Sequence, residues 1–254
     1  MAAGSPSATD YTSNQIQLYE RHPETGVYSY AKSKVCNQSL PQKSTFGVGA
    51  VVTSVPDQTI LFCEGYTAEN TGECRKFKQG EGFQEWDAIR PKSLNLARGH
   101  SVMTELDAWG LVWWIFTPAN GGTINTDLIK LDGTSPGLGP KLPEPLNMVC
   151  VLEIENVGIF LSGIPTTGGG SNGNKNWLYI SNKDGGSWKP LPESKEKRSG
   201  GSCGVFHPEE SITIVMAGGF FETMTSSEKF NLTRWLDDET SPGWVEGPDV
   251  GEAR

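Results

Sequence analysis

Short apolar runs recur along the chain, each bounded by glycine, proline or polar residues. The strongest runs span residues 59–63, 111–116, 157–161 and 212–216. A run of small residues precedes each of them, at 46–52, 99–103, 148–152 and 201–205, and an alternating segment follows, at 74–77, 126–131, 176–180 and 228–232. Short apolar runs between turn residues are typical of strands. The pattern therefore predicts an all-β chain whose strands come in repeating groups.

A fourth segment that carries a tryptophan closes three of these groups. Trp86 and Trp188 lie 188 − 86 = 102 residues apart, and Trp244 follows Trp188 after 244 − 188 = 56 residues. Leu138 stands near the middle of the first interval, where a further tryptophan would fall. A proline-containing turn comes after each anchor, and basic residues close three of the four groups. Four strands in about fifty residues are the content of one β-propeller blade.

The order of these features resembles the kelch repeat. In that repeat, an apolar strand, two glycines, a loop, a strand and a tryptophan precede a proline turn and an arginine. The resemblance covers residues 46–254 as four units, bounded at about 46–98, 99–147, 148–198 and 199–254. Only Gly218 and Gly219 keep both glycines, Leu138 replaces one tryptophan, and the family's third-strand tyrosine has no clear counterpart. WD40 is the alternative all-β repeat, but its Gly-His and Trp-Asp pairs do not recur. The resemblance implies a kelch-like β-propeller of four full blades, with its tryptophans packed between blades.

The first 45 residues are too few and too polar for a further blade. Residues 16–21 and 27–31 flank a His-Pro-Glu-Thr-Gly turn and predict one hairpin, equivalent to the outer half of a blade. Residues 1–14 are predicted to be a disordered leader, and residues 15–254 a single propeller domain. Kelch-like propellers usually have five to seven blades. We therefore expect a fragment or an incomplete ring, with an unusually small closed ring as the alternative.

Composition and charge narrow the classes of partner. The chain has 31 Gly and 16 Pro, the two poorest helix formers, which disfavours a mainly helical protein. Its net charge is −9, from 21 Lys and Arg against 30 Asp and Glu. An acidic surface repels phosphate backbones and anionic lipids, so neither a nucleic acid nor a membrane is expected as a partner. With three His and no Cys or His pair at zinc spacing, the sequence predicts no metal and no other cofactor.

The five cysteines are an odd number, which argues against a complete disulfide framework but allows one bridge. A turn at residues 67–70 places Cys63 opposite Cys74 across a hairpin, at a separation that a disulfide spans. The pair forms a bridge in an extracellular protein and two thiols in a reducing cytosol, and the sequence leaves both open. Cys150 and Cys203 share one register on the first strands of their units and are predicted to be small buried packing residues.

The compartment is left open by two opposing signals. Glycosylation triplets begin at Asn37 and Asn231 and favour secretion. The first ten residues have neither the charged nor the apolar region of a signal peptide, which favours the cytoplasm unless the natural N-terminus lies upstream.

The resemblance implies a protein-binding module that contacts a partner of basic or mixed surface through loops on one propeller face. On such a propeller, the loops between second and third strands share a face with the blade-to-blade connections. These loops span residues 67–71, 118–126, 165–174 and 220–227. The candidate contact residues are Arg98, Arg198, Phe220 and Phe221, and no catalytic residue is expected. The alternative for Phe220 and Phe221 is that both cap the core of the last blade.

The alternative function is that of a carbohydrate-active enzyme with a sialidase-like or epimerase-like propeller. Residues 181–188 resemble the Asp box of sialidases, but Asp184 lies one residue too near Trp188, and no arginine triad is evident. A cluster of arginines and carboxylates converging on the propeller axis would favour the enzyme. A channel lined by Gly, Val and Ser would favour the binding module.

Overall fold

The computed structural model describes the backbone of strands from residue 19 onward and most side chains from residue 124 onward. Its described backbone comprises residues 19–21, 28–30, 48–52, 59–63, 74–78, 82–85, 99–106, 111–118, 124–130, 137–166, 173–180, 186–207, 211–219 and 225–249. Side chains are described for residues 124–126, 128, 139–147, 149–166, 173–180, 186–207, 211–219 and 225–249.

The described strands form antiparallel sheets, which confirms the all-β prediction. Four sheets have four strands each, and the strands of each sheet follow one another in chain order. The first sheet comprises β3 (Val48–Val52), β4 (Thr59–Cys63), β5 (Cys74–Lys78) and β6 (Gly82–Glu85). The second comprises β7 (Gly99–Leu106), β8 (Leu111–Pro118), β9 (Asp127–Lys130) and β10 (Gly137–Leu138). The third comprises β11 (Leu146–Ile154), β12 (Gly158–Pro165), β13 (Lys175–Ile180) and β14 (Ser187–Leu191). The fourth comprises β15 (Ser202–Phe206), β16 (Thr213–Ala217), β17 (Ser227–Asn231) and β18 (Val245–Glu246).

The predicted N-terminal hairpin is also present. β1 (Tyr19–Arg21) pairs antiparallel with β2 (Tyr28–Tyr30) as a separate two-stranded sheet. The prediction for the end of the fourth sheet's third strand was wrong, because the chain leaves the strand after Asn231 and forms helix α1 (Leu232–Asp237). Helix α1 follows an N-cap, since the Asn231 side chain accepts a hydrogen bond from the Arg234 backbone N–H at 2.9 Å.

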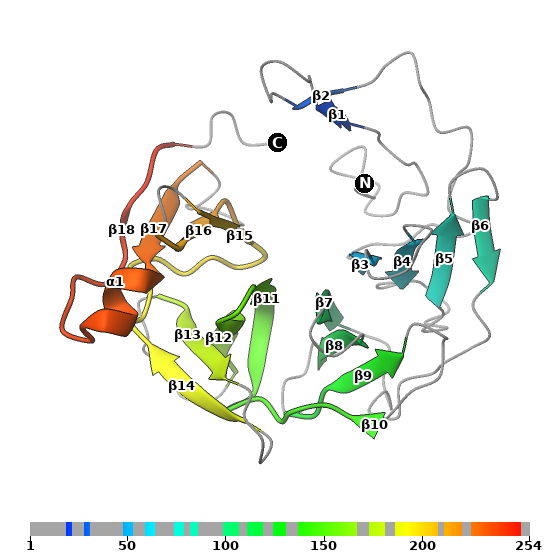
Figure 1. The fold of residues 1–254 in the computed structure, drawn as a ribbon, viewed down its shortest axis with the longest axis horizontal. Helices are drawn as coiled ribbons and strands as arrows, with labels where there is room; N and C mark the ends of the chain where they lie inside the picture. The colour runs from blue at the N-terminus through cyan, green and yellow to red at the C-terminus, as the bar shows by residue number, and fades with distance from the viewer. Residues whose placement is uncertain are drawn as a thin grey trace.

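Figure 1 shows the first strand of each four-stranded sheet toward the middle of the view and the fourth strand toward the outside. The first strands contact one another in order, β3 with β7, β7 with β11 and β11 with β15. Cys150 on β11 and Cys203 on β15 are joined by a disulfide, with their Cα atoms 6.1 Å apart. The prediction that these two cysteines serve only as packing residues was wrong. Their shared register on neighbouring first strands brings the two sulfurs together between sheets.

The third sheet is buried on both faces. Side chains of β12 and β13 alternate, so Ile159 and Trp177 face the second sheet while Phe160 and Leu178 face the fourth. The cluster toward the second sheet contains Leu142, Leu146, Val149, Ile159, Leu161, Trp177 and Tyr179. The cluster toward the fourth sheet contains Ile154, Phe160, Leu178, Leu191, Ile214, Met216, Phe230, Leu232, Trp235 and Trp244. These continuous apolar layers join the last three sheets.

The predicted anchor tryptophans differ in burial. Trp244 is 3 % exposed, and its indole N–H donates to the Pro192 carbonyl at 2.9 Å. Trp188 is half-buried at the edge of its cluster and donates to the Lys141 carbonyl at 2.6 Å. Each indole therefore bonds to the connection that follows the preceding sheet. The core prediction is confirmed for Trp244 and only in part for Trp188, and Trp86 lies outside the described residues.

Candidate functional site

The described ends of two loops lie close to sheet-to-sheet connections at one end of the third and fourth sheets. The loops are 166–174, between β12 and β13, and 218–226, between β16 and β17. Thr166 N–H donates to the Pro145 carbonyl at 3.0 Å, in the connection that leads into the third sheet. Ser194 N–H, in the connection that leaves that sheet, donates to the Asn174 carbonyl at 3.1 Å. The described ends of these loops therefore lie at the same end of the third and fourth sheets as the connections between sheets. We call this end the loop end.

Arg198 occupies the centre of the loop end and is 1 % exposed. Its Nη1 donates to the Gly218 carbonyl at 3.2 Å and to the Ser226 carbonyl at 2.8 Å. These two carbonyls stand at the two ends of the 218–226 loop, where Gly218 N–H also donates to the Ser226 carbonyl at 3.0 Å. Gly218 and Gly219 have φ values of 66° and 131°, which side-chain-bearing residues rarely adopt. The base of this loop is therefore closed by backbone geometry and by one guanidinium.

Two carboxylates pair with the buried guanidinium. Arg198 Nε donates to Glu228 Oε2 at 3.1 Å, and Nη2 donates to Glu196 Oε2 at 2.9 Å. Glu228 is also buried, and its Oε1 accepts from the Lys195 backbone N–H at 2.7 Å. Glu196 is partly exposed and accepts a further hydrogen bond from the Ser226 hydroxyl at 2.6 Å. Each charged group is therefore held by several partners, as a buried ion must be.

Asn174 ties the neighbouring loop to the same centre. Its Oδ1 accepts from the Arg198 backbone N–H at 3.0 Å, and its Nδ2 donates to Ser162 Oγ at 3.2 Å. Its own backbone N–H donates to Ser194 Oγ at 2.7 Å. The bases of both loops are thus linked through buried polar groups. We call Asn174, Ser194, Glu196, Arg198 and Glu228 together the Arg198 clasp.

The structure places one of the four candidate contact residues. Arg198 makes its described contacts inside the protein, so it positions the loops and offers little surface to a partner. Arg98, Phe220 and Phe221 lie outside the described residues. Sequence reasoning missed the internal role of Arg198 because a charged residue in a connection is normally exposed. Its carboxylate partner, Glu228, lies 30 residues further along the chain.

The predicted register of Cys63 and Cys74 is confirmed by the pairing of β4 with β5, in which the two residues are directly opposite. Their side chains lie outside the described part of the structure, so a bridge between them stays a prediction.

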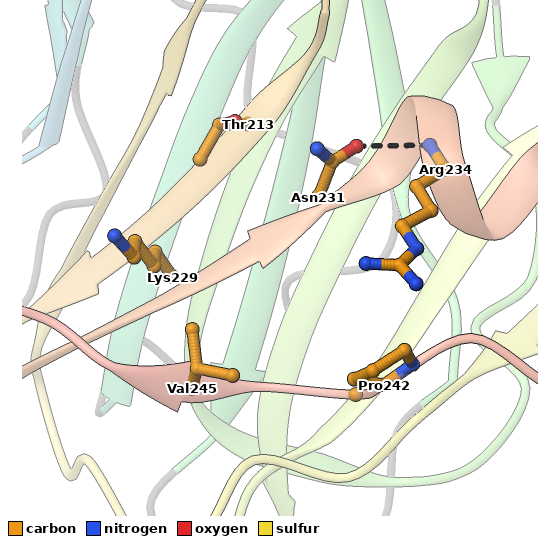
Figure 2. A pocket seen from close by; sticks show the side chains of 7 residues that line it. Thr213, Lys229, Asn231, Arg234, Pro242 and Val245 are labelled. Atoms are coloured by element: carbon orange, nitrogen blue, oxygen red, sulfur yellow. Dashed lines mark hydrogen bonds between the residues drawn. The ribbon is translucent and has the colours of Figure 1, made fainter.

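A second feature is a shallow hollow on the fourth sheet, on the face turned away from the third sheet. Figure 2 shows its walls, which come from β16, β17, helix α1 and the segment that leads into β18. Its volume is about 240 Å³, and it is lined by Thr213, Lys229, Asn231, Arg234, Pro242, Gly243 and Val245. The strand pattern gave no sign of it, because α1 was not expected.

Among the described residues, no three His, Cys, Asp or Glu side chains are grouped as metal ligands would be. The helix that the structure describes is too short to cross a membrane. No known family model matches the chain, and no curated protein matches it.

Proposed function

We propose that the chain is a kelch-like β-propeller that binds a partner protein through its loop end. Three features of the described residues support the architecture: four-stranded antiparallel sheets in chain order, contacts between successive first strands, and an indole bond from each of two sheets to the preceding connection. Stacking of this kind lets each sheet bury faces that it could not bury alone.

The Arg198 clasp carries the proposal of binding. Binding loops act best on a rigid base, because every residue that is ordered in advance reduces the entropy lost on association. One guanidinium holds both ends of the 218–226 loop, and Asn174 holds the end of the 166–174 loop to the same centre. Phe220 and Phe221 belong to the clamped loop and are the proposed apolar contacts. The net charge of −9 favours a partner with a basic or mixed surface.

A photocrosslinking experiment tests this proposal. A photoreactive phenylalanine analogue is placed at position 221, and in a matched control at position 155. Glu155 is exposed in the turn between β11 and β12, at the end of the sheet opposite the loop end. We expect a discrete crosslinked protein from position 221 and none from position 155. A third protein carries the photoreactive residue at position 170. In that protein, replacing both Phe220 and Phe221 by serine should abolish crosslinking to the partner without changing the thermal midpoint. Equal crosslinking from both ends, or none from position 221, would overturn the proposal.

The carbohydrate-active alternative gains no support from the described residues. The arginine and carboxylate grouping that they contain is the Arg198 clasp, which is paired internally and largely buried. Residues 181–185 of the Asp-box-like segment lie outside the described part, and the flanking strands β13 and β14 form a plain antiparallel pair. The proposal is therefore a binding module rather than an enzyme.

A further inference from the structure

Asn231 ends β17 and caps helix α1. Its side-chain oxygen Oδ1 accepts a hydrogen bond from the Arg234 backbone N–H at 2.9 Å. Because only the oxygen of the amide can accept, this bond identifies which atom is Oδ1 and which is Nδ2. The oxygen must face the helix because it is the acceptor, and Nδ2 must then lie on the other side. Figure 2 shows this nitrogen pointing away from α1.

Asn231 lies at the surface of the fourth sheet. The residue is exposed, and within the described part of the chain Nδ2 has no hydrogen-bond partner. Asn231 also lines the hollow of about 240 Å³, together with Pro242 and Val245 from the segment that leads into and through β18. A bulky group on Nδ2 of this exposed residue leaves the capping hydrogen bond through Oδ1 intact.

Two independent observations give this nitrogen a chemistry. Asn231, Leu232 and Thr233 form an acceptor triplet for N-linked glycans. The Cys150–Cys203 disulfide joins two sheets, and disulfides persist in oxidising compartments, where N-linked glycans are also attached. The triplet identifies Asn231 as an acceptor of a glycan, and the disulfide indicates a compartment in which glycans are attached.

We propose that Asn231 is an N-glycosylation site. An oligosaccharide passes from a lipid-linked pyrophosphate donor to the side chain. The bond between its anomeric carbon and Nδ2 forms, and the bond between that carbon and the pyrophosphate oxygen breaks. Nδ2 loses one proton, and the lipid pyrophosphate leaves. Because β17 begins at the loop end with Ser227 and finishes at Asn231, the glycan projects from the opposite end of the fourth sheet.

The test uses the full chain, expressed behind a secretory leader in eukaryotic cells, with a C-terminal tag that carries a proven acceptor triplet. Glycosylation of the tag reports entry into the secretory pathway. Peptide N-glycosidase treatment and mass spectrometry then locate each modified asparagine. We expect a glycan at Asn231 in the wild type. Asn231→Asp keeps an N-capping oxygen but removes the acceptor nitrogen, and should lose one glycan with its thermal midpoint nearly unchanged.

Two further variants complete the design. Thr233→Ser keeps the triplet and the hydroxyl that accepts the Ile212 N–H at 2.8 Å, so the glycan should remain. Asn37→Gln removes the other triplet and should leave the Asn231 glycan unaffected. A chain with a glycosylated tag but an unmodified Asn231 would overturn the proposal, as would equal glycan numbers in the wild type and in Asn231→Asp.

Discussion

Replacement of Arg198 by methionine tests the clasp at its centre. Methionine keeps an unbranched apolar stem of similar length, so most of the packing survives and the charge and the donors are lost. Glu228 then keeps its carboxylate in the interior with only the backbone N–H groups of Lys195 and Glu196, at 2.7 and 3.4 Å. The Gly218 carbonyl loses the donor that it had at 3.2 Å.

The unpaired carboxylate sets the size of the effect. The Arg198 and Glu228 side chains are 1 % and 3 % exposed, so solvent screens the pair very little. Removing one member of a buried ion pair costs about 3–5 kcal/mol. A surface pair would cost no more than about 1 kcal/mol. Arg198→Met should therefore destabilise the protein by about 3–5 kcal/mol, while Arg198→Met with Glu228→Gln should recover roughly half of that loss, because no net charge is left buried.

Urea unfolding followed by tryptophan fluorescence measures both variants and the Glu228→Gln single variant, which together complete a double-mutant cycle. The dependence of the unfolding free energy on urea concentration shows whether a substitution has changed the unfolded state. The crosslink from position 221 is a second readout, and it should weaken in Arg198→Met even where the protein is fully folded. A loss under about 1 kcal/mol, or additive single losses across the cycle, would refute the description of the clasp as a buried ion pair.

The remaining contacts give three further predictions. The Cys150–Cys203 bridge closes a separation of 53 residues, so Cys150→Ser with Cys203→Ser should cost about 4 kcal/mol in urea unfolding; equal stability would contradict the bridge. Trp244→Ala should cost about 3–5 kcal/mol and Trp188→Ala clearly less, because only Trp244 is fully buried; the reverse order would contradict the packing. Hydrogen bonds from the Thr240 hydroxyl and backbone N–H hold the pKa of Asp238 below its usual 3.8. Its contribution to stability is therefore present above pH 3.8 and is lost as the pH falls through the lower folded value; a carboxyl NMR titration with a midpoint at or above 3.8 would contradict this.

The sheets could be predicted from the sequence because they depend on local pattern. Alternation, apolar runs and turn residues fix which strands pair, and Cys63 faces Cys74 as the turn position requires. β11 begins at Leu146, two residues before the expected start of its unit, an error of the size usual at element ends. Helix α1 was missed because six residues carry too little periodicity, and only the capping residue Asn231 marks its start.

Contacts between sheets could not be predicted in the same way. The Cys150–Cys203 bridge joins two sheets, and the Arg198–Glu228 pair joins the connection after the third sheet to the fourth sheet. Their geometry depends on how neighbouring sheets stack, which no hairpin rule describes. The shared register of the two cysteines was visible in the sequence, but it predicts a bridge only if β11 is known to lie next to β15.

Ion pairs at successive sheet junctions have opposite polarity. Between the second and third sheets, Glu144 in the connection accepts from Lys175 at the start of β13, at 3.2 Å. Between the third and fourth sheets, the connection supplies the cation, Arg198, and β17 supplies the carboxylate, Glu228. The first pair is partly exposed and contributes little, whereas the second is buried.

The same position between the first and second sheets holds Arg98 in the connection and Asp127 at the start of β9. The two residues are 127 − 98 = 29 apart, against 30 for Arg198 and Glu228. We therefore expect Arg98 to pair with Asp127 and to support its loops as Arg198 does. Arg98→Met and Asp127→Asn should each destabilise the protein, and their losses should not add in a double-mutant cycle of urea unfolding. Additive losses would show that the two residues act independently and would leave Arg98 as a candidate for direct contact with the partner.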